Sequence, residues 1–295
     1  MSSTANDWNP FVRRERYSDS AIVKYRTWTS VTFLLSAVGT CLYVLHPPFN
    51  GSGNAHRIWW WNHHYRTAFS LNPVIVNIYW IVMLINQASY MSGLWMNRDS
   101  PTNTNAAALG SHFITNNILN FLFVVLFAYG HFLTALIVLI INLFNLSALY
   151  HRHNSYARWM HWPVVAGPLA WTIVAILWTG AIVAPWGNST VLRIMGNIAI
   201  WALVPIGMYF LVAFGDYTMG FSLGVLTWAL AMGQIMEKLV SLQWVFAFVI
   251  MGMLFVASFM VAVPAWTGRR MAWLGSNESA DAEGERRPLI PDQQV

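Results

Sequence analysis

The chain has 295 residues, of which 57% are hydrophobic and only 9% charged, and its mean hydropathy is +0.47. Soluble domains carry charge on about a quarter of their residues, so this composition excludes a soluble globular protein and predicts an integral membrane protein. The net charge of +5 does not indicate nucleic-acid binding, because the basic residues flank apolar segments and form no continuous stripe. The single cysteine, Cys41, excludes a disulfide framework.

Eight apolar segments follow one another along the chain. Residues 1–26 form a basic segment in which we expect no signal peptide, and residues 27–267 are predicted to form a transmembrane bundle. Each candidate span is long enough for the hydrocarbon core; the spans cover about 27–45, 73–96, 106–129, 131–150, 160–184, 191–214, 217–236 and 242–263. We therefore predict an all-α polytopic helix bundle, in which the Gly-rich 217–236 segment could instead be re-entrant.

The basic residues predict the orientation of this bundle. An even number of spans puts both termini on one side, and with that side in the cytosol twelve of the 16 Lys and Arg residues lie inside. The four on the opposite side are Arg57, Arg66, Arg193 and Lys238. This asymmetry follows the positive-inside rule, so both termini are predicted to be cytosolic.

The longest loop, residues 47–71, lies outside in this topology and contains three consecutive tryptophans, among them Trp60 and Trp61. Long loops in compact proteins are usually functional or disordered, and the tryptophans argue against disorder. Two interpretations stay open, an interfacial segment on the lipid headgroups and a lid over the bundle. Asn50 in this loop and Asn188 in a later outside loop begin sequons, which makes them candidate glycosylation sites.

The composition becomes polar after the last span, so residues 268–295 are predicted to form a disordered cytosolic tail. Within the tail, Glu285 followed by Leu289 and Ile290 resembles an acidic dileucine sorting signal, which coat adaptors read as an extended peptide. This resemblance implies a coat adaptor as a partner. It favours an endosomal or vacuolar endomembrane over the plasma membrane.

The stretch from Arg158 to Trp186 is apolar for long enough to cross a bilayer and has tryptophans both at its ends and in its middle. End tryptophans are ordinary interfacial anchors. The middle pair, Trp171 and Trp178, lies away from the interfaces, so interfacial anchoring does not explain it. Positions seven apart share a helical face, so we expect these indoles to lie one above the other and to be able to line a cavity.

Most polar residues inside the predicted spans are amides. Asn116 and Asn120 lie one turn apart on the third predicted helix; the others are Asn77, Asn86, Asn142, Asn145 and Asn197. Amides in a membrane bundle hydrogen-bond across helices and contribute about 0.6–2 kcal/mol each. They can also contact a polar group of a ligand, and the sequence leaves both interpretations open.

The nine histidines lie beside no Glu-x-x-His or His-Glu-x-x-His pattern, so we expect neither a metal site nor a haem cofactor. No Gly-x-Ser-x-Gly motif occurs, and we assign no catalytic residue. Asp216 and Glu237, both near predicted helix ends, are the acidic residues left for an ion-coupling role or for starting a reaction.

Three segments resemble, in the same order, helices two, three and five of the tryptophan-rich sensory proteins, the TspO or peripheral benzodiazepine receptor family. They are Phe69–Met96 with Asn72-Pro73 and Tyr79-Trp80, the run from Asn116 to Phe127, and Pro168-Leu-Ala-Trp171 with Trp178. The resemblance covers about residues 27–187 and implies a five-helix part with a pocket for porphyrins, sterols or synthetic ligands. It also implies that Trp171 and the loop tryptophans face the ligand and that Asn120 lies on the pocket wall.

This sequence departs from that family's pattern in three ways. The double proline and tryptophan that open its second helix are reduced to Asn72-Pro73, its Leu-Asn-x-x-Trp becomes Leu119-Asn-Phe-Leu-Phe123, and three further helices follow.

A second resemblance covers the full length. The segments NPFVRRERYS, LNPVIVNIYW and FGDYTMGF are similar to a group of uncharacterised fungal multi-pass proteins. This similarity implies a multi-pass membrane protein and brings no established activity.

Together these features predict a membrane protein that binds or senses a hydrophobic or amphipathic small molecule, sterol-like or tetrapyrrole-like, in an endomembrane. The expected site lies between the second, third and fifth helices under the 47–71 loop. Its predicted ligand-binding residues are Trp171, Trp178, Asn120, Asn116, Trp60, Trp61 and Tyr79. Three alternatives stay open: a transporter of such a molecule, an intramembrane enzyme such as a terpene-type cyclase, and a membrane scaffold or assembly factor.

Overall fold

The computed structural model describes residues 17–46, 55–96, 101–152, 158–184, 190–237 and 242–267, and every regular element within these ranges is a helix. The elements are α1 (Asp19–Leu45), α2 (Ile58–His64), α3 (Pro73–Gly93), α4 (Pro101–Ala128), α5 (Phe132–Arg152), α6 (Arg158–His161), the π-helical turn η1 (Trp162–Ala166), α7 (Gly167–Val183), α8 (Thr190–Ala199), the 3₁₀ turn η2 (Ile200–Ala202), α9 (Leu203–Phe214), α10 (Tyr217–Glu237) and α11 (Gln243–Thr267).

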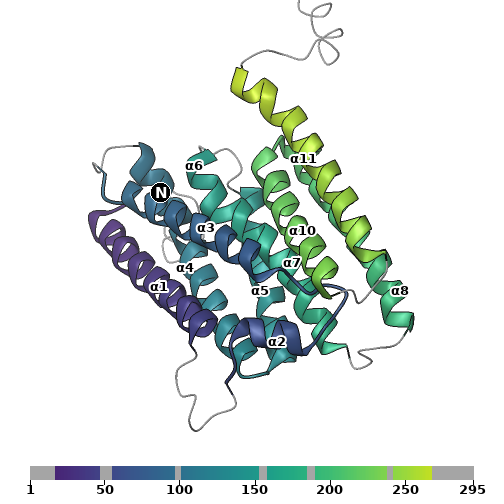
Figure 1. The fold of residues 1–295 in the computed structure, drawn as a ribbon. Coiled ribbons are helices and arrows are strands. Elements are labelled where there is room, and N and C mark those ends of the chain that lie inside the picture. Colours follow the sequence, from purple (N-terminus) through teal and green to yellow (C-terminus); the bar gives the residue numbers. More distant parts are fainter. Residues whose placement is uncertain are drawn as a thin grey trace, which may run out of the picture.

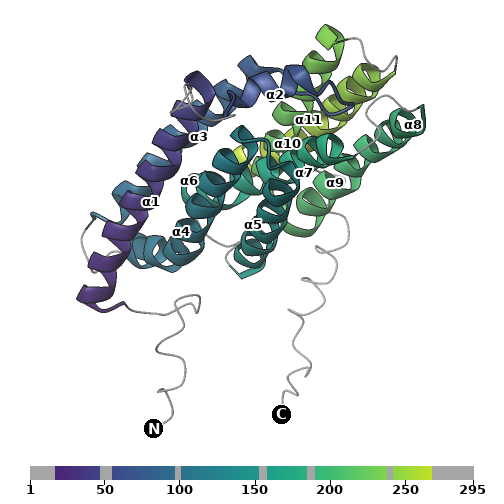
Figure 2. The same cartoon turned by 90° about the horizontal axis from the view of Figure 1, so that it is seen from below.

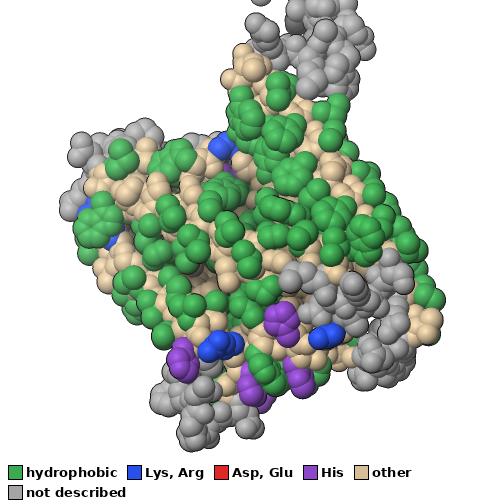
Figure 3. All heavy atoms as spheres, viewed as in Figure 1, with side chains coloured by type: hydrophobic (Ala, Val, Ile, Leu, Met, Phe, Trp, Pro, Cys, Tyr) green, Lys and Arg blue, Asp and Glu red, His purple; other side chains and the backbone are tan. Residues whose placement is uncertain are grey.

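Eight helical stretches in this described part are long and apolar enough to cross a membrane, which confirms the predicted fold class and number of spans. The Gly-rich seventh segment is one continuous helix of 21 residues, α10. Hydrophobic side chains cover the face on which α3 and α10 lie, and basic and histidine side chains gather at its lower edge (Figure 3). The chain therefore has the architecture of a multi-pass membrane protein.

The helices pack in a sequence of neighbours, with α1 on α4, α4 on α5, α5 on α7, α7 on α10 and α10 on α11. The helices α1 and α11 lie at opposite edges of the bundle (Figure 1). Of the eight spans, Arg158–Val183 is the most buried, with 72% of its most apolar window inside the structure, against 28–33% for five of the others. The tryptophan-containing stretch is thus the central helix of the bundle.

Short polar side chains set the ends of several helices. Ser18 Oγ accepts a hydrogen bond from the Ala21 N–H, so α1 begins at Asp19, before the predicted start of the span. Asn72 Oδ1 accepts from the N–H groups of Val74 and Ile75 at the start of α3. Gly215, at φ 58°, ends α9 in the left-handed conformation that glycine adopts without strain.

The central span continues through a π-helical turn at η1, where Pro163 and Pro168 remove two backbone donors. The Gly167 N–H bonds to Trp162 O in the π pattern, and the next bond of that pattern, from residue 168 to Pro163 O, has no donor. Gln87 Nε2 instead donates to Pro163 O at 3.0 Å, and Tyr79 Oη donates to Gly167 O at 2.8 Å. Side chains of α3 therefore tie this turn to α3.

The loop before α3 folds onto one end of the bundle, which we call the lid end. There α2 lies across the helix ends (Figures 1 and 2). Asn62 exchanges two hydrogen bonds with the backbone of Leu71, each 3.0 Å long, and the Trp61 indole donates to Ala128 O at 2.9 Å. Of the two interpretations of this loop, these contacts favour the lid and not the segment that lies on the lipid headgroups.

Candidate functional site

A cavity of about 200 Å³ lies beside the central helix near the lid end. Five helices contribute to its wall, and we call it the tryptophan cavity. Its lining residues are Thr40, Cys41, Val44, Leu45, Ile58, Trp59, Val76, Asn77, Trp80, Ile81, Leu84, Asn120, Phe123, Val124, Trp171 and Trp178. It therefore contains three of the predicted ligand-binding residues, Trp171, Trp178 and Asn120.

Four indoles in contact form the aromatic part of this wall. The rings of Trp171 and Trp178 are 6.3 Å apart at 57°, so they are tilted and not stacked. Trp59 of α2 stacks on Trp178 at 5.8 Å, and Trp80 of α3 meets Trp171 edge-on at 5.5 Å. Such a wall presents large apolar faces with few rotatable bonds, which suits a flat ring system.

Few polar atoms accompany these rings. Asn120 Nδ2 donates to Ser36 Oγ at 3.0 Å, while its Oδ1 accepts no hydrogen bond from the described residues. The Trp59 indole donates to Asn77 Oδ1 at 3.1 Å. The indole N–H groups of Trp171 and Trp178 are buried and have no partner in the described part of the chain. Unpaired buried polar groups are costly, and they commonly mark functional sites.

The cavity opens sideways between α1 and α3, which touch only slightly. Three of its outer lining residues are exposed there: Cys41, Leu45 at 69% and Ile81 at 56%. Both helices are candidate spans, so this opening faces the hydrocarbon of the bilayer. A ligand can thus reach the cavity from the membrane without crossing water.

The structure places the two predicted loop tryptophans outside this cavity. Trp61 lies against Ala128 and Phe132, and Trp60 is 40% exposed and stacks on His56 at 3.8 Å. Successive helical residues point about 100° apart, so one of three consecutive tryptophans can face inward. In the structure that residue is Trp59, and the rotation of α2 about its own axis determines this choice.

Asn116 lies one turn from Asn120 but does not line the tryptophan cavity. Its Oδ1 accepts from Asn142 Nδ2 at 2.9 Å, and Asn145 bonds to His112 on the same pair of helices. These bonds join α4 to α5. Asn116 therefore forms a hydrogen bond across helices, whereas Asn120 both bonds to a neighbouring helix and lines the cavity.

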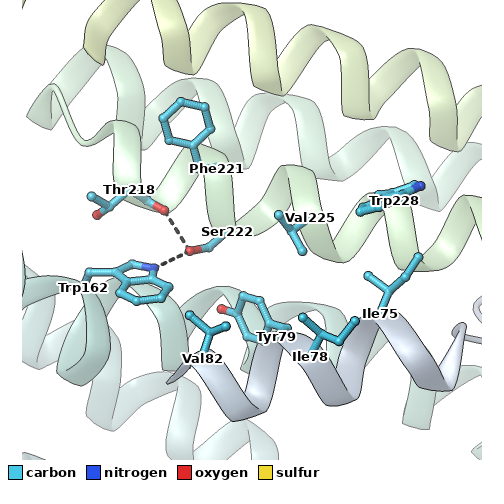
Figure 4. Close-up of a pocket in the computed structure, with 10 residues that line it drawn as sticks. All are labelled: Ile75, Ile78, Tyr79, Val82, Trp162, Thr218, Phe221, Ser222, Val225 and Trp228. Atoms are coloured by element: carbon cyan, nitrogen blue, oxygen red, sulfur yellow. Dashed lines mark hydrogen bonds between the residues drawn. The ribbon is translucent and has the colours of Figure 1, made fainter. Parts of the chain in front are cut away.

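Tyr79 lines a second hollow of about 420 Å³ on the other side of α3, the α3–α10 groove. Its lining residues are Ile75, Ile78, Tyr79, Val82, Trp162, Thr218, Phe221, Ser222, Val225 and Trp228 (Figure 4). Two of the polar side chains here are paired within the protein: the Trp162 indole donates to Ser222 Oγ at 2.9 Å, and Ser222 Oγ donates to Thr218 O at 2.8 Å. The sequence does not predict this groove, because its two walls lie about 140 residues apart in the chain.

Asp216 is fully buried at the opposite end of the bundle, the α6 end. Its Oδ1 accepts from the backbone and hydroxyl of Thr218, at 3.0 and 2.6 Å, and lies 3.2 Å from Arg158 Nη1. Its Oδ2 accepts from Tyr150 Oη at 2.8 Å and His161 Nε2 at 2.9 Å. Asp216 thus begins α10 and ties it to α5 and α6.

Burial alone would raise the pKa of the Asp216 carboxyl. The hydrogen bond and charge of His161, with the hydrogen bonds from Thr218 and Tyr150, lower that pKa well below its ordinary value. A carboxylate held ionised in this way serves as a structural anion.

Comparison with known proteins gives one match. The model of a family described as fungal protein of unknown function (DUF1774) matches residues 193–290. The chain is similar to this fungal family. That similarity agrees with the predicted uncharacterised fungal family and covers α9, α10 and α11, while the tryptophan cavity lies outside it. No curated protein and no solved structure matches the chain, and the resemblance to the tryptophan-rich sensory proteins stays a prediction.

Several predicted sites lie outside the described residues. These are the sequon residues Asn50 and Asn188 and the sorting-signal residues Glu285, Leu289 and Ile290. They stay predictions from the sequence.

Proposed function

We propose that the protein binds or senses a hydrophobic or amphipathic small molecule, sterol-like or tetrapyrrole-like, and that the tryptophan cavity receives it from the bilayer. The observation that carries this proposal is an aromatic cavity between candidate spans that opens toward lipid and is closed at one end by α2. Trp171, Trp178 and Trp59 provide ring faces, and Asn120 Oδ1 provides an acceptor that no described residue uses.

The volume limits how such a ligand binds. A cavity of about 150 Å³ holds a single benzene ring, so about 200 Å³ holds one end of a fused-ring molecule. The rest would lie in the opening between α1 and α3, against the exposed side chains of Leu45 and Ile81. We therefore expect a ligand that inserts one end and stays partly in contact with the bilayer.

A transporter is the second candidate, and the π-helical turn η1 favours it. Such turns inside α-helices are frequent at functional sites, and η1 is followed directly by the helix that carries Trp171 and Trp178. A cyclase gains no support from Asp216, which does not line the cavity. A scaffold role predicts that these tryptophans pack and hold no ligand.

The cellular part of the proposal rests on the sequence. We propose an endosomal or vacuolar membrane, with both termini cytosolic and a coat adaptor bound to Glu285, Leu289 and Ile290. Glycosylation at Asn50 or Asn188 would mark the lid end as lumenal.

Mass spectrometry of small molecules that copurify with the protein tests the ligand. The variant Cys41→Trp fills the opening from an exposed position, and Leu34→Trp is its matched control because Leu34 lies two turns away on α1, is 58% exposed and does not line the cavity. We expect a flat amphipathic compound with wild type and Leu34→Trp, and its loss from Cys41→Trp. Equal amounts in all three samples would contradict the proposal.

A further inference from the structure

The α10 wall of the α3–α10 groove is about as long as one bilayer leaflet is thick. Its α10 wall runs from Thr218 to Trp228, ten residues or about 15 Å at the helical rise, and the hydrocarbon core of a bilayer is about 30 Å thick. Thr218 is the second residue of the span. Trp162 and Thr218 lie at one end of the groove and Ile75 and Trp228 at the other (Figure 4). The groove therefore starts at the α6 end of α10 and reaches the middle of that helix, where it meets Ile75 near the start of α3.

The chemistry of its wall specifies a hydrocarbon occupant. Ile78, Val82 and Trp228 are 56%, 43% and 42% exposed, so the groove opens to lipid. The hydroxyls of Ser222 and Tyr79 and the Trp162 indole already donate to partners within the protein. A polar group placed here would lose its hydrogen bonds with water and gain few in return.

A basic side chain stands at the surface end of this groove. Arg158 lies one helical turn before Trp162, and it contacts Asp216 and Gly215 O just before Thr218, so it adjoins the end of the groove that Trp162 and Thr218 form. Its side chain is 37% exposed. Two of its five N–H donors have these partners, which leaves donors for a phosphate.

The charge around Arg158 favours an anion. Asp216 is buried and shares its charge among several donors. The charged Lys, Arg, Asp and Glu residues at this end, within the described ranges, are Lys24, Arg26, Arg152 and Arg158 against Asp19 and Asp216. The resulting surplus of two positive charges attracts anionic lipid.

We propose that the α3–α10 groove binds an acidic glycerophospholipid of the leaflet at the α6 end, with one acyl chain in the groove and its phosphate at Arg158. This site is separate from the tryptophan cavity, and its binding does not depend on the proposed ligand. It would make the contact between α3 and α10 depend on the lipid composition of the membrane.

Native mass spectrometry in mild detergent, with added phosphatidic acid or phosphatidylcholine of identical chains, tests the groove. Ile78→Trp fills it, and Ile85→Trp is the matched control because Ile85 is 64% exposed, lies two turns further along α3 and does not line the groove. We expect wild type and Ile85→Trp to retain one phosphatidic acid that Ile78→Trp loses. Equal retention by Ile78→Trp and Ile85→Trp would overturn the proposal.

The headgroup is tested by the ratio of the two lipids retained. One arginine near a membrane surface is expected to favour the anionic lipid about fivefold. Arg158→Gln should abolish this preference, whereas Arg57→Gln, at the exposed start of α2, should keep it. Arg158→Lys retains the charge and should keep a preference that falls with added salt. An unchanged ratio in Arg158→Gln, or no preference in wild type, would overturn the role of Arg158.

Discussion

The tryptophan cavity and the α3–α10 groove lie on opposite sides of the same helix and differ in how their polar groups are paired. In the cavity, Asn120 Oδ1 and the indole N–H groups of Trp171 and Trp178 have no hydrogen-bond partner among the residues that the structure describes. In the groove, Tyr79, Trp162 and Ser222 donate within the protein. The cavity therefore offers a ligand one amide oxygen and two indole N–H groups, whereas these three side chains of the groove have their donors already occupied.

The largest difference is expected between the losses of stability that follow when a tryptophan is removed from each wall. Trp178 is fully buried against Trp59 and Phe127, so Trp178→Ala should cost about 3–5 kcal/mol of stability. Trp228 is 42% exposed on the groove, so Trp228→Ala should cost less than about 1 kcal/mol. Reversible unfolding in mixed micelles measures both; equal losses would contradict the assignment of one wall as core and the other as lipid-facing.

Breaking the network at the α6 end should affect both hollows, because it anchors the helices on either side of η1. Asp216→Asn leaves Arg158 and His161 without their anion and should cost about 3–5 kcal/mol. The folded pKa of Asp216 is depressed, so its contribution is fully present above the unfolded pKa of about 4 and is lost as pH falls through the folded value. Thermal unfolding from pH 7 to pH 3 should therefore show a smaller acid loss in Asp216→Asn than in wild type.

The helix that separates the two hollows is held close to η1 by a glycine. A Cβ at Gly167 would overlap the Met83 side chain, so Gly167→Ala should push α3 away and cost about 1–3 kcal/mol. Met83→Ala removes the obstructing atoms. In a double-mutant cycle the two substitutions should compensate in part, and simple additivity would show that this contact does not position α3.

The smallest losses of stability are expected for the two amides on α4, which should differ in their effect on ligand binding. Asn116→Leu breaks the bond to Asn142 and should cost about 0.6–2 kcal/mol without changing the copurifying ligand. Asn120→Leu should cost a similar amount and also reduce the bound ligand, because Asn120 lines the cavity. Loss of ligand in both variants, measured per folded protein, would restore Asn116 as a binding residue.

The features that the sequence predicted correctly depend on residues close together in the chain, whereas those that it missed depend on contacts between separate helices. The seven-residue spacing of Trp171 and Trp178 is local, and both residues line one cavity. The choice among Trp59, Trp60 and Trp61 depends on the rotation of a short helix against Ala128. Tyr79 shares a helix with the cavity residue Trp80 but faces the groove, since adjacent residues point in different directions.

Hydropathy alone determined that the chain is all-helical and has eight spans, because a bilayer requires each crossing segment to be apolar and to satisfy its own backbone. It also placed the tryptophan-containing fifth span. Only the tertiary structure decided that this span is central, that Gln87 supplies the donor that Pro163 O lacks, and that Asp216 joins three helices. The physical reason is that these contacts join residues far apart in the sequence, and helix rotation and packing bring them together.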